Sequence, residues 1–403
     1  MKPFCVILAF ALCLGSTFIV SGQEKEPAKT KTDLQTLVEG NNEFAFDLYA
    51  RLRKKPGNII FSPYSISSAL AMTYAGAHGK TAEKVAKVMH FRLPQDRLHP
   101  AFAQLNAELN EYNKIGIDFC LANALWCQQE FNFRQEFLDL TKKHHGAAVQ
   151  KVDFIKESEQ ARSKINQWVS LQTKGVVNDL LPSDSINEAT RVVLTNALYM
   201  KAGWGQKFAP DRTKNAPFEL LSGKQVSVQM MHHPEKELHF NYHVGDGCQW
   251  LELPYSGSRL AMVLILPNRK GQLPNVESAL TPAMIQKGIA GLSKWPGIVI
   301  LPRFKANLLV ALTEHLREMG LEKSELTHIS EEILVLSDIR HQAFVEVNEE
   351  GTTAAAGTGA IVVPLADKRP FTFNADHPFL FLIRDTRSGM ILFLGRVTDP
   401  SRS

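Results

Sequence analysis

A run of small residues near the C-terminus, residues 349–370, constrains this sequence more than any other feature. It reads EEGTTAAAGTGAIVVPLADKRP, beginning with two glutamates and turning hydrophobic only at residues 361–363. A composition of Gly, Ala and Thr would suit a flexible linker. Every second residue from Thr352 to Val362 is nevertheless uncharged and no larger than valine. Because side chains alternate between faces along a strand, the segment could exist as an exposed loop or be buried as a strand within a sheet.

The composition suits a soluble globular protein that buries a large core. The chain has 403 residues, of which 44% are hydrophobic and 21% charged, with a formal net charge of +4. Its basic residues are spread along the sequence, whereas a nucleic-acid-binding protein gathers them in a patch. We therefore expect no nucleic-acid partner.

Residues 1–22 have the pattern of a secretory signal peptide. Lys2 precedes an apolar run from Phe4 to Leu14, and small residues follow up to Gly22. The run is too short to span a membrane comfortably. We therefore expect cleavage near Gly22 and a secreted chain, extracellular or periplasmic, with no membrane attachment. An uncleaved anchor and a lipid on Cys13 are the alternatives.

The rest of the chain is expected to form one domain. Residues 23–33 are charged and lack large hydrophobic side chains, as in a disordered leader. No composition shift or long linker divides residues 34–403. Three cysteines remain after the signal, Cys120, Cys127 and Cys248, and we expect free thiols. The first two lie seven residues apart in one predicted strand, about 23 Å from each other and on opposite faces.

Hydrophobic periodicity predicts an α+β chain with most helices early and most strands late. The predicted helices lie within residues 41–55, 62–75, 80–91, 94–112, 133–145 and 157–173, with another that follows Phe304 and ends at Met319–Gly320. The predicted strands are residues 117–127, 191–200, 225–232, 248–254, 259–266, 297–303, 342–346, 379–383 and 390–397.

The sequence lacks the motifs of common enzymes and cofactor sites. It has no Gly-x-Ser-x-Gly, no His-Glu-x-x-His and no phosphate-binding glycine loop, so we expect neither intrinsic catalysis nor a cofactor. Two pairs of adjacent histidines occur, at 144–145 and 232–233. Neighbouring side chains in a helix or strand point in different directions, so neither pair resembles a metal site. The span 94–112 offers only Arg97 as a lysine or arginine, so strong activation by a polyanion such as heparin is not expected.

Several longer motifs follow one another along the chain. They are NIIFSPYSISSAL at 58–70, GAHGKT at 76–81, INQWV at 165–169, TKG at 173–175, LTNALYMKAGW at 194–204, LPRF at 301–304, EEGT at 349–352, DHPFLF at 376–381 and GRVTDP at 395–400. In these motifs the chain resembles the serpins, over nearly all of residues 34–400.

This resemblance implies a fold of three β-sheets and eight or nine helices, with an exposed reactive loop at residues 349–370. A target serine peptidase attacks the loop as a substrate and forms a covalent acyl-enzyme. The cleaved loop then inserts as a central strand of the largest sheet and distorts the peptidase. It thus implies a metastable peptidase inhibitor, expected as a monomer, that is consumed in one turnover.

The same resemblance places the reactive bond fourteen residues beyond Gly351, between Leu365 and Ala366. Val363 and Pro364 would then contact neighbouring peptidase subsites. Leucine suits a chymotrypsin-like or elastase-like target, and a cysteine peptidase is a further alternative. If the bond instead followed Lys368 or Arg369, the target would be trypsin-like.

The resemblance also implies roles for two further groups of residues. The hinge that enters the sheet first comprises Glu350, Gly351, Thr352, Thr353, Ala354, Ala355, Ala356, Gly357 and Thr358, with Thr353 in place of the usual acidic residue. Ser62, Ser65, Asn196 and His341 would control the parting of the central strands, and Trp204 would lie near the top of the sheet or simply belong to the core. A non-inhibitory serpin, acting as a carrier, chaperone or storage protein, is the main alternative. The small hinge residues argue against it.

Overall fold

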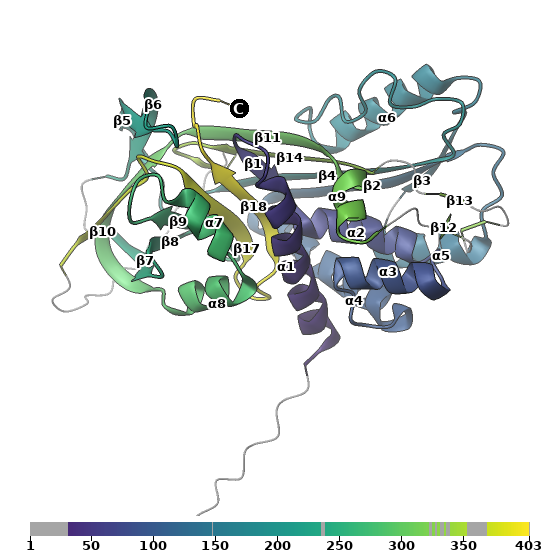
Figure 1. The fold of residues 1–403 in the computed structure, drawn as a ribbon, viewed down its shortest axis with the longest axis horizontal. Helices are drawn as coiled ribbons and strands as arrows, with labels where there is room; N and C mark the ends of the chain where they lie inside the picture. The colour runs from purple at the N-terminus through teal and green to yellow at the C-terminus, as the bar shows by residue number, and fades with distance from the viewer. Residues whose placement is uncertain are drawn as a thin grey trace, which may run out of the picture. The chain divides into compact units, whose positions relative to one another are not determined.

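Most helices come early in the chain and most strands late, in a mixed α+β arrangement (Figure 1). The computed structural model describes residues 31–146, 148–234, 238–321, 325–326, 329–330, 334–335, 339–352 and 369–402. Within them the α-helices are α1 (Asp33–Leu52), α2 (Pro63–Tyr74), α3 (Gly79–Met89), α4 (Gln95–Asn110), α5 (Gln135–His145), α6 (Ser158–Gln172), α7 (Leu273–Ala279), α8 (Pro282–Ala290) and α9 (Leu312–Glu318), and a 3-10 helix covers Glu111–Ile115.

A six-stranded sheet lies between helices on both faces (Figure 1). One cluster of buried side chains, including Trp126, Ile165 and Val193, joins one face of the sheet to α6. The main core joins the other face to α2. The strand order is β11 (Phe304–Ala311), β14 (Ile339–Val347), β15 (Gly351–Thr352), β4 (Val192–Gly203), β2 (Asp118–Gln128) and β3 (Ala148–Val152).

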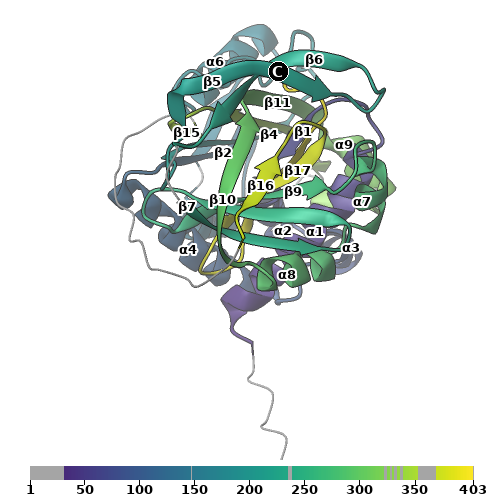
Figure 2. The same cartoon turned by 90° about the vertical axis from the view of Figure 1, so that its left-hand side faces the viewer.

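A larger, ten-stranded sheet carries most of the hydrophobic core. Its order is β1 (Ile59–Phe61), β18 (Ile391–Val397), β17 (Phe379–Asp385), β9 (Leu260–Pro267), β8 (Cys248–Pro254), β7 (Leu238–Gly245), β10 (Ser293–Pro302), β6 (Gln225–His232) and β5 (Ala209–Glu219), with β16 (Phe371–Asn374) beside β10 (Figure 2). Every residue of β9 and β18 is buried, as expected of strands covered on both faces. A two-stranded sheet pairs β12 (Glu325–Leu326) with β13 (Leu334–Val335).

Helix α2 starts where the sequence provides both a cap and a preset backbone. The hydroxyl of Ser62 accepts a hydrogen bond from the amide of Ser65, and Pro63 occupies the first turn. Both features stabilise a helix N-terminus. All twelve residues of α2 are buried, so the helix runs through the core and brings its serines against the six-stranded sheet.

Most predicted elements are present, with shifted ends. The helix expected to end at Met319–Gly320 is α9, whose last helical residue is Glu318. Strand β11 precedes this helix and was not predicted. In β11 buried and exposed residues largely alternate, which is the pattern of a strand and not of a helix. Strands β5 and β7 were not predicted, because few of their side chains are buried. The three cysteines are free, as expected.

Helix α1 begins at Asp33, with Thr32 as its capping residue. The preceding residues of the expected signal peptide and leader, up to residue 30, lie outside the described part of the chain. No helix within the described part is long and apolar enough to cross a membrane.

A buried ion pair links the C-terminal strand to the helices. Arg396 on β18 donates from Nη1 to Glu277 Oε1 on α7 at 2.8 Å, and both side chains are almost fully buried. The hydroxyl of Tyr49 donates to the same carboxylate oxygen at 2.5 Å. The guanidinium also donates to the backbone carbonyl of Gly57, so one side chain joins three distant segments.

Replacing Arg396 with Met should lower the free energy of unfolding by about 3–5 kcal/mol, because the Glu277 charge would stay buried without its cation. Lys114→Met is the control, since its pair with Glu111 is solvent-exposed and should contribute about 1 kcal/mol or less. Denaturant unfolding of both variants checks this. Equal, small losses would contradict the structural role of the Arg396 pair.

Candidate functional site

The junction between β14 and β4 is the candidate functional site. Along the first part of β4 the two strands pair directly and in parallel, from Ile339 opposite Leu194 to Ala343 opposite Leu198. Toward the end of β4, β15 lies between them, with Thr352 opposite both Ala202 and Val347. The strands therefore diverge to admit the first residues of segment 349–370, which run antiparallel to both neighbours.

Gly351 begins β15 at a position where a side chain does not fit. Its φ is +156°, a value that residues with a side chain rarely adopt. A Cβ at this position would lie 2.1 Å from the carbonyl oxygen of Ala202 and 2.6 Å from the Cα of Gly203. Both are backbone atoms of β4, so the close approach of the two strands requires glycine here.

Thr352 is fully buried and is held by two aromatic residues. Its hydroxyl forms a 2.6 Å hydrogen bond with the hydroxyl of Tyr255. The ring of Tyr255 stacks on that of Trp204, with centroids 4.7 Å apart and planes 8° from parallel. The indole of Trp204 in turn donates to the carbonyl oxygen of Asn348 at 2.9 Å. These contacts fix the start of the hinge between the two strands.

The two glutamates before the hinge are anchored by cations. Glu349 accepts hydrogen bonds from Arg303 Nε at 2.8 and 2.9 Å, and from the hydroxyl of Thr213. Burial alone would raise the pKa of Glu349, but the hydrogen bonds from Arg303 and Thr213 outweigh it and hold that pKa below its ordinary value. Glu350 pairs with Lys207. The chain is thus tied to β5, to the segment between β10 and β11, and to the segment after β4 just before it enters the sheet.

A buried hydrogen-bond network crosses the closed part of the junction. His341 Nε2 accepts from the amide of Ser62 at 3.0 Å, and Nδ1 donates to Asn196 Oδ1 at 2.6 Å. The amide nitrogen of Asn196 donates to the carbonyl oxygen of Ser65 at 2.7 Å and to Asn123 Oδ1 at 2.6 Å. Because His341 and Asn196 are directly paired residues of β14 and β4, the network must rearrange whenever these strands part.

The network requires His341 to be neutral. An imidazole that accepts at one nitrogen and donates at the other cannot carry a second proton without losing a bond. Complete burial lowers the pKa of His341 to about 3. We call this set of residues the shutter network; it comprises Ser62, Ser65, Asn123, Asn196 and His341. Its hydrogen bonds are all formed only when the imidazole of His341 is neutral.

The structure brings four of the predicted sheet-opening residues together, namely Ser62, Ser65, Asn196 and His341. Ser65 contributes its backbone carbonyl, whereas its buried hydroxyl has no hydrogen-bond partner among the described residues. Trp204 lies apart, at the hinge, and packs into the core as well. The role of these residues in opening the sheet stays a prediction. The rest of the hinge, Thr353 to Thr358, and the predicted reactive positions Val363, Pro364, Leu365 and Ala366 lie outside the described residues.

Sequence reasoning missed several residues of the site. Asn123, which also donates to Ser68 at 3.1 Å, is the one amide in an otherwise apolar stretch of β2, and that isolation was the available signal. Tyr255 and Arg303 carried no such signal, because their importance depends on the placement of the hinge.

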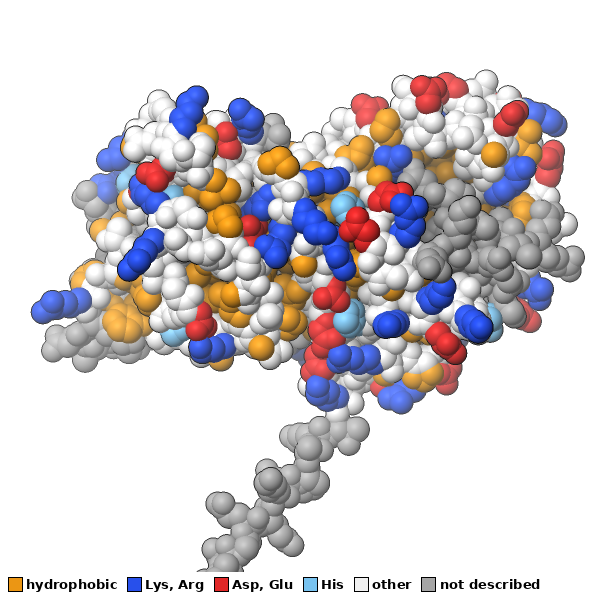
Figure 3. All heavy atoms as spheres, viewed as in Figure 1, with side chains coloured by type: hydrophobic (Ala, Val, Ile, Leu, Met, Phe, Trp, Pro, Cys, Tyr) orange, Lys and Arg blue, Asp and Glu red, His pale blue; other side chains and the backbone are white. Residues whose placement is uncertain are grey.

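The basic residues at and just beyond α4, which were considered for polyanion binding, form ion pairs with nearby acidic residues. Arg97 on α4 pairs with Asp33, and Lys114 pairs with Glu111. Among the described residues, no group of three or more His, Cys, Asp or Glu side chains could hold a metal ion. On the face shown in Figure 3, basic and acidic side chains are interspersed.

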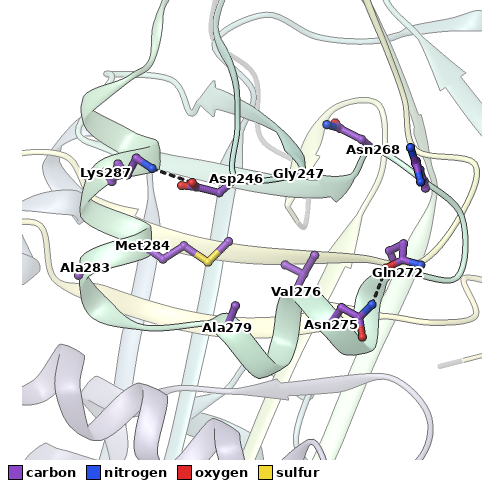
Figure 4. A pocket seen from close by; sticks show the side chains of 11 residues that line it. Asp246, Gly247, Asn268, Gln272, Asn275, Val276, Ala279, Ala283, Met284 and Lys287 are labelled. Carbon is purple, nitrogen blue, oxygen red and sulfur yellow. Dashed lines mark hydrogen bonds and ion pairs between the residues drawn. The ribbon is translucent and has the colours of Figure 1, made fainter.

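A cavity of about 790 Å³ lies away from the junction, between α7, α8 and the β7–β8 turn (Figure 4). Val276 and Met284 point toward each other across it. At its rim, Lys287 pairs with Asp246 at 2.6 Å. Such an apolar floor with a few polar groups is a common form of ligand pocket.

Lowering the pH should weaken the native structure through His341. Its pKa in the folded chain lies below the ordinary value of about 6.5, so its contribution to stability is complete above that pH and is lost as the pH falls toward 3. Between pH 7 and pH 5 the loss should reach about 2 kcal/mol.

His341→Gln should lose less stability than the parent over that interval, because glutamine does not titrate. Thermal unfolding at several pH values measures the difference. Burial also lowers the pKa of His99, His145 and His233, so both proteins should weaken in acid. Identical pH dependence in both would contradict the assignment to His341.

Comparison with known proteins now connects this geometry to a family. Residues 39–400 match the family model described as Serpin (serine protease inhibitor). The leukocyte elastase inhibitor of Xenopus tropicalis is 39% identical over 380 residues, covering 91% of this chain and 100% of that protein. Its name is that of a protease inhibitor and not of an enzyme.

Solved structures agree. An Arabidopsis serpin in its native stressed conformation aligns with a TM-score of 0.82 and 26% identity, over 93% of this chain and 100% of that one. Human thyroxine-binding globulin complexed with thyroxine aligns with a TM-score of 0.81 and 30% identity, over 92% and 100%. The expected serpin fold is confirmed. The chain belongs to the serpins, the family of serine protease inhibitors.

Proposed function

We propose that this protein is an irreversible, suicide-substrate inhibitor of serine endopeptidases. The loop is cleaved between Leu365 and Ala366 while an acyl-enzyme forms at Leu365. The freed segment then inserts between β14 and β4 and traps the peptidase. The observation that carries this proposal is β15, which already occupies the first two positions of the insertion path.

The register of β15 defines that path. Thr352 faces Ala202 on β4 and Val347 on β14. Continuing both antiparallel ladders, each further loop residue pairs one position earlier on each strand. Val362 would then face Val192, the first residue of β4. The predicted cleavage after Leu365 thus falls just beyond the length that β4 can accommodate.

The same register gives the shutter network a partner after insertion. Six residues beyond Thr352, Thr358 would lie between Asn196 and His341, the two residues that pair directly before insertion. Directly paired residues present their side chains on the same face of a sheet. The Thr358 hydroxyl would therefore lie between the side chains of Asn196 and His341, whose hydrogen bond to each other would be broken by insertion. A threonine can both donate and accept there.

The residue before the cut sets the target class. Leu365 suits a chymotrypsin-like or elastase-like pocket, with Val363 and Pro364 in adjoining subsites. Cleavage after Lys368 or Arg369 would instead indicate a trypsin-like target, and a cysteine peptidase is a further possibility. The inhibitor would act as a monomer, secreted after removal of residues 1–22, without cofactor or heparin, since the cations at and just beyond α4 are already paired.

A non-inhibitory carrier is the alternative, favoured by the cavity between α7 and α8. One structural neighbour is a thyroxine complex, and the cavity has room for a drug-sized ligand. The small, uncharged hinge favours inhibition instead, because it preserves the ability to enter the sheet.

The proposal predicts a covalent complex that survives denaturing electrophoresis when the mature chain is mixed with chymotrypsin or neutrophil elastase. Mass spectrometry should find a released peptide that begins at Ala366. Thr352→Arg is the matched test of insertion, because burying an unpaired charge beside Tyr255 is costly. This variant should be cleaved at the same bond, with complex formation reduced at least tenfold.

Cleavage of the parent chain without any complex would overturn the inhibitory proposal and favour the carrier. A complex with trypsin alone, with a new terminus after residue 368 or 369, would contradict the proposed bond.

A further inference from the structure

We propose that a cavity beneath the connection between α6 and β4 receives the side chain of Ile361 once the loop has been cleaved. Ile361 would then anchor the far end of the inserted strand. This inference rests on the proposed inhibitory function and assigns a positioning residue to it.

The cavity has a volume of about 360 Å³. Its apolar lining comes from Leu181 and Ile186 in the connection, and from Val192 and Val193 at the start of β4. All four are buried. The volume exceeds what one branched side chain needs, so the cavity can accept an apolar residue without displacing the connection.

The cavity lies at the end of the path that β15 begins. Direct pairing of β14 with β4 ends at Ile339 and Leu194. In the described part of the chain, Val193 and Val192 therefore lie beyond the last pair that must separate. Arg340 of β14, which pairs with Thr195 of β4, lines the same cavity, so the cavity is bordered by both strands that the loop would separate.

The register places Ile361 at this cavity. Thr352 faces Ala202, so nine residues later Ile361 would face Val193. Val193 points to the α6 face of the sheet, where it packs with Trp126, Leu181 and Ile186. Because directly paired residues share a face, the side chain of Ile361 would point to that face as well.

The loop sequence fits the space that α6 leaves. On the same face, the residues preceding Ile361 at every second position are Thr353, Ala355, Gly357 and Gly359. They would lie under α6, where Val169 packs against Ala122 and Ala197 of the sheet. Small residues suit that narrow space, and the first large side chain coincides with the cavity.

An anchored end would favour completion of insertion over hydrolysis of the acyl-enzyme. Removing apolar side-chain atoms that fill a cavity weakens the state that buries them. The anchor therefore acts on the inserted state, after the peptidase has bound and cleaved the loop.

The test compares Ile361→Ala with Val363→Ala in the full mature chain. Val363 is also apolar and would point to the same face of the sheet as Ile361. It would lie beyond Val192, the first residue of β4, and so outside the cavity. Each chain is cleaved at Leu365, the cut is confirmed by mass, and thermal unfolding is measured. A fluorescent peptide of residues 353–362, with Ile or Ala at position 361, is also titrated into the uncleaved chain.

Cleaved Ile361→Ala should unfold at a clearly lower temperature than the cleaved parent, while Val363→Ala should match the parent. The peptide with Ala should bind at least about tenfold more weakly. Ala189→Phe, which would fill the cavity from the connection, should weaken binding of the Ile peptide in the same way.

Equal midpoints and equal peptide affinities would overturn the inference while leaving inhibition intact. Failure of the parent chain itself to gain thermal stability on cleavage would instead contradict the proposed function.

Discussion

The structure depends on one shared edge, where β14 and β4 pair directly and His341 bonds to Asn196 across them. This pairing closes the sheet below β15 and buries the network under α2. The backbone hydrogen-bonding groups of β14 and β4 can be satisfied in two ways. The two strands can pair with each other, as here, or each can pair with a strand inserted between them. The second arrangement adds a ladder of hydrogen bonds and buries further apolar surface, so the observed sheet would be held by a kinetic barrier.

Contacts at the start of the hinge would contribute to that barrier. Gly351 and Thr352 are already within the sheet, while Trp204, Tyr255 and Arg303 hold the chain around them. These contacts commit the hinge to one register and resist its withdrawal. In the proposed mechanism, the shutter network would block further entry until its hydrogen bonds exchange partners. The residues that hold the hinge within the sheet and the residues that would block further insertion are thus different, and they lie at opposite ends of the β14–β4 junction.

Much of the fold and part of the candidate site could be predicted from sequence, because these features depend on residues that are close together along the chain. The small residues at alternate positions after Gly351 predicted a segment that could be buried, and hydrophobic periodicity predicted the helix at residues 62–75. The helix that ends at Met319 was predicted and is α9, whereas β11 was missed because two adjacent leucines interrupt the alternation in its sequence. Asn123 and Tyr255 were missed because their roles arise from the pairing of strands that are far apart in sequence. Such a register is set by the whole sheet and not by neighbouring residues.

A disulfide across the junction tests the central claim most directly. Gln342 and Ala197 are directly paired on β14 and β4, close enough in a parallel ladder for cysteines at both positions to be joined. We predict that the oxidised chain is cleaved by the target peptidase without forming a covalent complex, and that reduction restores the complex. Complex formation at the same rate with the disulfide intact would show that these strands need not part, and would contradict the account.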